Sequence, residues 1–127
     1  MQIISAAFKS NQPIPSKYTC DGKNISPPLE FKDVPQNASS LALIVDDPDA
    51  PGGDFVHWLV WNIPPTVLSI LENFVPEGAV QGTTDFGNKK YGGPCPPSGT
   101  HHYFFKLFAL DANLDLPPSS TKKDLCN

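Results

Sequence analysis

Fifteen prolines among 127 residues constrain the fold of this chain more than any other feature of its sequence. This is about twice the proline share of an ordinary globular protein. Because proline fixes φ and lacks a backbone N–H, it is tolerated in turns but not inside helices or central strands. The prolines gather in stretches such as DDPDAPGGD, NIPPT and GGPCPPSGT. A helical bundle is therefore disfavoured, and we expect a mainly β protein with long, stiff, proline-rich loops.

Apolar runs lie between these loops, at residues 41–46, 55–63 and 103–110. Their apolar residues are nearly continuous instead of alternating with polar ones, and many are β-branched or aromatic. Runs of this length, bounded by Pro, Gly and Asp, are typical of strands that are buried on both faces or in the core of a sandwich. We expect these runs to be core strands, with the ring of Trp58 or of Trp61 pointing inward.

Helix signals are weak, so we expect few and short helices. Residues 66–74 follow two prolines and have apolar side chains that could form one face of a two-turn helix. Near the end of the chain, Thr121 and Asp124 have the spacing of a capping box, which predicts a helix start. A helix this short is not stable alone and must pack on the core or on another chain.

The length and the charge of the chain exclude several classes of protein. A chain of 127 residues is typical of one domain with one hydrophobic core, here residues 1–127. The net charge of −4 and the lack of a basic stripe argue against binding to nucleic acid or to an anionic membrane. The sequence has no apolar run long enough to span a bilayer, and its start, MQIISAAFKS, lacks the features of a secretory signal. We therefore expect a cytoplasmic protein without stable membrane association.

The cysteines leave two interpretations open. Cys20, Cys95 and Cys126 are an odd set without C-x-x-C spacing, so a structural zinc site is not expected. They are either reduced thiols of a cytosolic protein, or Cys20 and Cys95 form a disulfide bond between two turns.

Acids and histidines stand directly beside the predicted core strands. Asp47 and Asp49 lie two residues apart, so their side chains share a face of an extended segment. His57 lies in the next apolar run, and His101 and Tyr103 lie two apart at the entrance to the last one. These residues could assemble into one site with two carboxylates, two imidazoles and a phenol. Taken singly, each acid could instead cap a turn and each histidine could be a satisfied strand residue.

Three stretches of the sequence resemble one known family. They are YTCDGKNISPPLEF (18–31), DDPDAPGGDFVHWLVWNIP (46–64) and YGGPCPPSGTHHYFFKLFALD (91–111). The signatures D-P-D-A-P, followed by a histidine, and G-P-x-P-P-x-G-x-H-x-Y resemble those of the phosphatidylethanolamine-binding protein family. This family is also called the Raf kinase inhibitor protein family, and the resemblance is to its bacterial and archaeal branch.

The resemblance implies an antiparallel β-sandwich with a Greek-key element and a small pocket that binds phosphate-like anions. It implies a set of ligand-binding residues: Asp47, Asp49, His57, Gly93, Pro94, His101 and Tyr103. Protonated imidazoles, the Tyr103 hydroxyl and backbone N–H groups would donate to the anion. Asp47 would accept a hydrogen bond from His57 and set its tautomer or charge. In the DAP turn, Ala50–Pro51 is a candidate for a cis peptide bond.

The function that we expect is that of a non-catalytic binding module for a phosphate-bearing small molecule or headgroup, without a cofactor. A protein partner such as a kinase is implied by the resemblance alone. Relatives in this branch continue beyond Asp124 and Leu125 into a longer helix, so the C-terminal helix here is expected to be truncated. The apolar surface that this leaves could be covered by a second copy of the chain, which predicts a homodimer.

Two other functions stay open at this point. Asp47, His57 and His101 could act as acid and base in a small hydrolase or isomerase, although the sequence has no recognisable nucleophile motif. Two histidines and one aspartate could also bind non-haem iron or zinc. The sequence has no H-x-H or H-E-x-x-H spacing, so no metal ligand is assigned.

Overall fold

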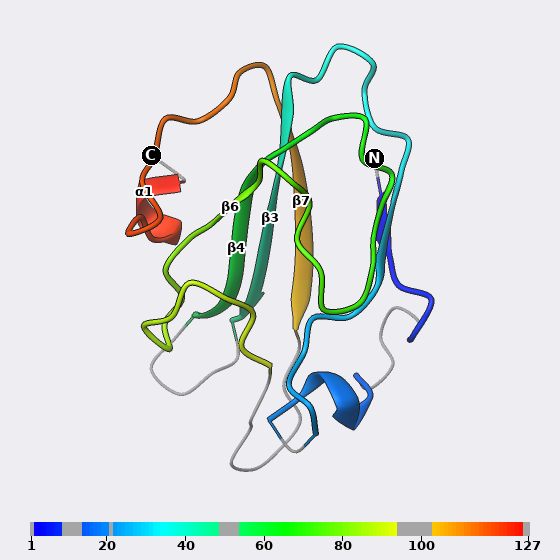
Figure 1. Cartoon of the computed structure of the whole chain (residues 1–127), viewed down its shortest axis with the longest axis vertical. Helices are drawn as coiled ribbons and strands as arrows, with labels where there is room; N and C mark the ends of the chain where they lie inside the picture. The colour runs from blue at the N-terminus through cyan, green and yellow to red at the C-terminus, as the bar shows by residue number, and fades with distance from the viewer. Residues whose placement is uncertain (1, 9–13, 21, 49–53, 94–102, 126–127) are drawn as a thin grey trace.

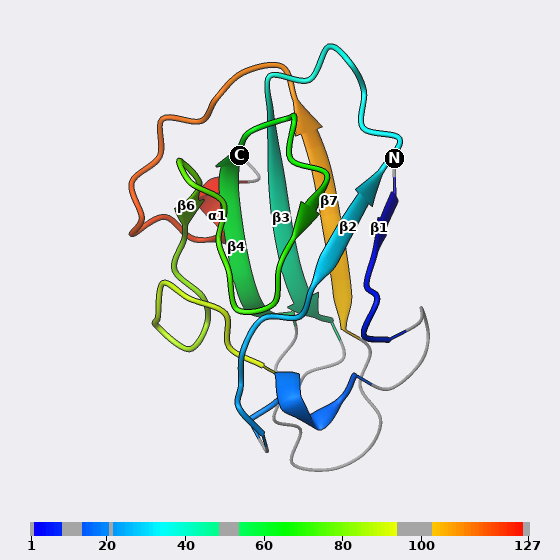
Figure 2. The ribbon, with the colours of Figure 1, turned by 45° about the vertical axis from the view of Figure 1, so that its right-hand side comes forward.

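Two antiparallel sheets make up the fold (Figure 1, Figure 2). The structure is a computed structural model, which describes residues 2–8, 14–20, 22–48, 54–93 and 103–125. The small sheet has the order β1 (Gln2–Ile4), β2 (Leu29–Lys32), β5 (Ser69–Ile70). The large sheet has the order β6 (Val80–Gln81), β4 (Phe55–Ile63), β3 (Ser40–Asp47), β7 (Phe104–Leu110). A short 3₁₀-helix, η1 (Ser16–Tyr18), and a short helix, α1 (Lys122–Leu125), complete the described elements. The prediction of a mainly β fold with two antiparallel sheets is confirmed.

The large sheet is buried on both of its faces. One face packs against the small sheet, where Leu43 and Trp58 meet Leu29 and Phe31. The other face carries a second apolar layer that includes Trp61. This second layer is covered by the last residue of β7 and by residues that follow the strand: Leu110, Leu114, Leu116 and Leu125. Two covered faces explain why the apolar runs of β3 and β4 are continuous.

Both tryptophans are buried, but in different layers. Trp58 lies between the sheets and is 1% exposed, whereas Trp61 lies in the outer layer and is 0% exposed. The expectation that one ring points inward was therefore too narrow. Their odd spacing puts them on opposite faces of β4, and each face has its own cover.

Strand β7 is less buried than the sequence predicted. It lies at an edge of the large sheet, and one of its faces packs in the core through Phe105, Leu107 and Ala109, whereas the other face packs only through Leu110 at its end. On the other face Phe104 and Phe108 are 46% and 41% exposed. An apolar run therefore predicted the strand correctly but not its position at the edge.

The predicted helix over residues 66–74 is wrong. Part of this segment is strand β5, which pairs with β2, and Phe31 N donates to the Leu68 carbonyl at 2.8 Å. This pairing takes the backbone groups that a helix would use internally. By contrast, the predicted capping box is present, because Thr121 N donates to Asp124 Oδ2 at 2.9 Å and α1 begins at the next residue.

Cys20 is disulfide-bonded, and its partner lies outside the described residues. The interpretation that all three thiols are reduced is therefore wrong for Cys20, and its pairing with Cys95 stays a prediction. The candidate cis bond Ala50–Pro51 also lies outside the described residues. In the described part of the chain, no helix is long and apolar enough to cross a bilayer.

Candidate functional site

His57 lies at a β-bulge in strand β4. Val45 of β3 pairs with Trp58, and Asp46 pairs with Val56, so one step along β3 matches two steps along β4. His57 is the extra residue. A bulge of this kind bends its strand and re-aims a side chain, and bulges are common beside functional sites.

Gly92 is bonded to both the backbone and the ring of His57. Gly92 N donates to the His57 carbonyl at 3.0 Å, and His57 Nδ1 lies 2.8 Å from the Gly92 carbonyl oxygen. A carbonyl oxygen can only accept, so Nδ1 carries the proton and Nε2 is the other, unassigned nitrogen. The tautomer of the neutral ring is therefore set by Gly92 and not by Asp47. The charge of Asp47 does favour the protonated ring, as predicted, and a hydrogen bond from His57 to Asp47 stays a prediction.

Aromatic rings surround the His57 imidazole. Its ring centroid lies 5.1 Å from that of Phe55, 5.5 Å from that of Phe86 and 5.3 Å from that of Tyr103. The two contacts with Phe86 and Tyr103 are edge-on. His57 is 4% exposed as a result, and its side chain is held by rings as well as by Gly92.

Burial lowers the pKa of His57 below its usual value near 6.5. The hydrogen bond to Gly92 and the charges of Asp47, Asp46 and Asp85 act in the opposite direction, but they do not overcome the effect of burial. The imidazole is therefore neutral at pH 7, and Nε2 presents a lone pair.

Asp47 and Tyr103 lie near His57 at the same end of the large sheet. Asp47 is the last residue of β3 and is 3% exposed, and Tyr103 directly precedes β7. Burial, and then the charge of Asp47, raise the pKa of Tyr103 to about 12. The Tyr103 hydroxyl is therefore protonated over the physiological range and can donate a hydrogen bond.

The wall that carries Gly92 and Gly93 is fixed by the loop around η1. Gly93 N donates to Asn24 Oδ1 at 2.7 Å, and the buried Tyr91 hydroxyl donates to the Tyr18 carbonyl at 2.8 Å. A Cβ on Gly93 would overlap the Tyr18 carbonyl oxygen. Only glycine allows this close approach of two backbones, so the wall is built before any ligand arrives.

Asp46 directly precedes Asp47, but its carboxylate is paired with two lysines. It is 0% exposed, and its Oδ2 accepts from Lys106 Nζ at 3.0 Å and from Lys122 Nζ at 2.8 Å. Lys122 also bonds to Asp54, so helix α1 is tied to the ends of β3 and β4. This network pairs the charge of Asp46 with two ammonium groups, whereas Asp47 lies near the Tyr103 and His57 rings.

The sequence missed several residues of the site. Asp85 accepts from Val56 N at 2.7 Å and donates through its own N–H to the Val56 carbonyl at 3.1 Å, next to the bulge. Phe86 packs on the His57 ring, and Gly92 holds it. The only signal in the sequence for any of these was the Gly92-Gly93 pair, which predicts a close backbone approach without naming its partner.

The structure brings together four of the predicted site residues, from different parts of the chain: Asp47, His57, Gly93 and Tyr103. In Figure 1 they belong to the lower ends of β3, β4 and β7 and to the adjoining loop. The other three, Asp49, Pro94 and His101, lie outside the described residues. Within the described residues, no group of three or more His, Cys, Asp or Glu side chains could hold a metal ion.

Comparison with known proteins extends over almost the whole chain. Residues 4–127 match the family described as phosphatidylethanolamine-binding protein. The chain is 52% identical to a UPF0098 protein of Methanothermobacter thermautotrophicus, over 98% of this chain and 86% of that protein. It is also 52% identical to a UPF0098 protein of Aquifex aeolicus, over 98% of this chain and 77% of that one.

Solved structures agree with this assignment. The fold matches that of CT736 from Chlamydia trachomatis with a TM-score of 0.93 and 44% identity, over 98% of this chain and 84% of that one. It matches E. coli YbcL, described as a member of the mammalian PEBP family, with a TM-score of 0.92 and 36% identity, over 98% of this chain and 86% of that one. The chain therefore belongs to the phosphatidylethanolamine-binding protein family.

Proposed function

We propose that the site around His57 binds a phosphate-like anion, free or as part of a headgroup, and that it acts as a non-catalytic binding module. The observation that carries this proposal is the orientation of His57. Gly92 occupies its Nδ1, which leaves Nε2 for a ligand. The Tyr103 ring lies 5.3 Å away, and its hydroxyl adds a donor that stays protonated.

Binding at this site is coupled to a proton. A neutral imidazole offers a lone pair at Nε2, which repels an anion, so His57 must gain a proton before it can donate. Burial keeps the pKa of His57 below its usual value in the free protein, and a bound anion raises it. The affinity for phosphate should therefore rise as the pH falls below about 6.5.

Asp47 gives the site a mixed charge. Its carboxylate favours the imidazolium form of His57, while it repels any anion that approaches it directly. A headgroup that carries both a phosphate and an ammonium group suits this arrangement, with the phosphate toward His57 and Tyr103 and the ammonium toward Asp47. We therefore expect phosphoethanolamine to bind better than inorganic phosphate.

Isothermal titration calorimetry at pH 5.5, 6.5 and 7.5 tests the proposal with inorganic phosphate and with phosphoethanolamine. His57→Asn keeps a donor near the Gly92 carbonyl but removes Nε2, and it should cost roughly 1.5–3 kcal/mol of binding free energy. Asp47→Asn should shift the affinity profile to lower pH without abolishing binding. Asp33→Asn, an exposed acid in another part of the chain, is the matched control and should change nothing.

The same samples separate the competing functions. If the wild type releases inorganic phosphate from phosphoethanolamine, and His57→Asn and Asp47→Asn do not, the acid–base enzyme is supported instead. Sensitivity of binding to EDTA would support a metal site. Binding that is independent of pH and unchanged in His57→Asn would refute the proposal.

A further inference from the structure

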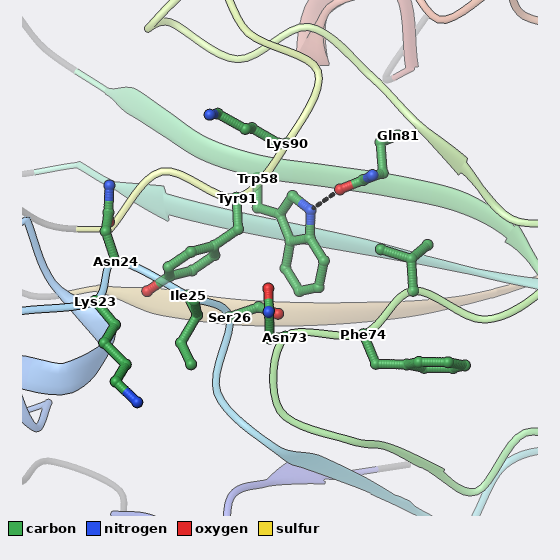
Figure 3. A pocket seen from close by; sticks show the side chains of 11 residues that line it. Lys23, Asn24, Ile25, Ser26, Trp58, Asn73, Phe74, Gln81, Lys90 and Tyr91 are labelled. Atoms are coloured by element: carbon green, nitrogen blue, oxygen red, sulfur yellow. Dashed lines mark hydrogen bonds between the residues drawn. The ribbon is translucent and has the colours of Figure 1, made fainter.

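A cavity lies apart from His57, at the side of the large sheet. Its volume is about 360 Å³, which lies within the usual range of small-molecule sites. The loop that contains Ser26, the segment 73–75, strand β6 and the segment 90–91 surround it. Figure 3 shows the rings of Trp58 and Tyr91 on the side of the cavity that belongs to the large sheet.

On the aromatic side of this cavity, two rings pack against each other, and their polar atoms are already hydrogen-bonded within the protein. The rings of Trp58 and Tyr91 meet edge-on, with centroids 5.6 Å apart. Trp58 Nε1 donates to Gln81 Oε1 at 2.8 Å (Figure 3), and the Tyr91 hydroxyl donates to the Tyr18 carbonyl. A ligand would therefore meet their apolar ring atoms, which suit a flat, apolar group.

Unused polar groups face these rings. Ser26 is 4% exposed and lines the cavity, yet its hydroxyl makes no hydrogen bond with any described residue. The Asn73 side chain has no partner there either, although Asn73 N donates to the Ser26 carbonyl at 2.9 Å and ties the two loops together. Both groups are accessible from the cavity, so a ligand could exchange hydrogen bonds with them in place of water.

The charged residues of the cavity have one sign. Lys23 and Lys90 line its margin, and no Asp or Glu lines it, although the chain as a whole has a net charge of −4. In Figure 3 both ammonium groups point away from the Trp58 ring. Glu72 does not line the cavity and is paired with Lys17 Nζ at 2.8 Å. The margin therefore favours an anion over a cation.

From these observations we infer that the cavity binds a small aromatic carboxylate. Its ring would lie against Trp58 and Tyr91, its polar edge would reach Ser26 and Asn73, and its carboxylate would lie toward Lys23 and Lys90. This site is independent of the proposed anion site, because it contains neither His57 nor Tyr103.

NMR titration of the full chain with benzoate tests this inference. Trp58 and Trp61 provide the only two indole N–H signals of the chain, and Trp61 lies in the other apolar layer. Benzoate should shift the Trp58 Nε1–H signal and the backbone amides of Ser26 and Asn73, and leave the Trp61 signal in place. Benzamide, of the same shape without the charge, and cyclohexanecarboxylate, of the same charge without the flat ring, should both bind more weakly.

Variants then assign the contacts. Ser26→Ala should weaken benzoate binding roughly three- to tenfold, as expected for one hydrogen bond. Lys23→Gln and Lys90→Gln should each weaken it by roughly two- to fivefold, and Lys89→Gln, the neighbouring lysine outside the cavity, should have no effect. His57→Asn should leave benzoate binding unchanged, which separates this site from the anion site.

The inference is overturned if benzoate shifts none of the cavity signals, or if acetate shifts them as much as benzoate does. It is also overturned if the shifts appear only at His57 and Tyr103, or if Lys89→Gln weakens binding as much as Lys90→Gln.

Discussion

Replacing Lys106 and Lys122 by methionine tests whether Asp46 is a buried charge that depends on two partners. Asp46 is 0% exposed, and its Oδ2 accepts both ammonium groups, while Oδ1 has no partner in the described structure. The lysine side chains are 41% and 28% exposed, so solvent screens each pair on one side. Methionine keeps most of the apolar stem of lysine and removes only its charge and donor.

The double variant should lower the free energy of unfolding by more than the sum of the two single variants. Each single variant leaves Asp46 with one ammonium partner, so we expect a loss of about 1–2 kcal/mol in the free energy of unfolding. The double variant leaves a buried carboxylate with no partner, which typically costs about 3–5 kcal/mol. The coupling between the two substitutions should therefore be destabilising by roughly 1 kcal/mol or more.

Urea denaturation at pH 7, followed by tryptophan fluorescence, measures these free energies for the wild type, both single variants and the double variant. Lys89→Met, an exposed lysine without an ion pair in the described structure, is the control for loss of a surface charge. Additive losses, or a double variant no less stable than the single ones, would show that Asp46 is solvated.

Other predictions follow from the same structure. Trp58→Ala and Trp61→Ala should each cost roughly 3–5 kcal/mol, since each ring fills its own apolar layer; wild-type-like melting of either variant would contradict this layering. Because the pKa of His57 is lowered on folding, the unfolded chain takes up its proton first, and stability should fall as the pH drops below about 6.5. His57→Asn should flatten that part of the denaturation profile, and an unchanged slope would mean that other groups cause it. Leu68 and Leu71 are 65% and 70% exposed, and we expect the chain to self-associate through such apolar surface. A monomer at high micromolar concentration, measured by light scattering, would contradict this.

The sequence predicted the parts of the fold whose burial is complete. Strands β3 and β4 appear in it as long apolar runs because both faces of the large sheet are covered. Strands β5 and β6 have two residues each, and they exist only because β2 and β4 lie beside them. A strand of two residues is too short to show an alternation of apolar and polar side chains, which is why residues 66–74 resembled a helix.

The sequence predicted Asp47, His57 and Tyr103 at the candidate site, but not Asp85, Phe86 or the hydrogen bonds of the site. Asp47, His57 and Tyr103 meet because β3 pairs with both β4 and β7, which puts the ends of these strands together. The partner of the His57 ring lies 35 residues away, in a loop without any pattern that points to it. Nothing local in the sequence points to a carbonyl acceptor such as Gly92, so the sequence did not predict which group sets the tautomer of His57.

The bulge at His57 connects the packing of the sheet to the chemistry of the site. In a regular antiparallel pair, His57 would lie directly opposite a residue of β3. As the extra residue of β4, it turns its carbonyl and its Nδ1 to Gly92 instead. The same change of register keeps Trp58 between the sheets and Val56 in the outer layer, two residues apart but on opposite faces. One inserted residue therefore satisfies the His57 carbonyl, preserves both apolar layers and fixes the orientation of the imidazole through Nδ1.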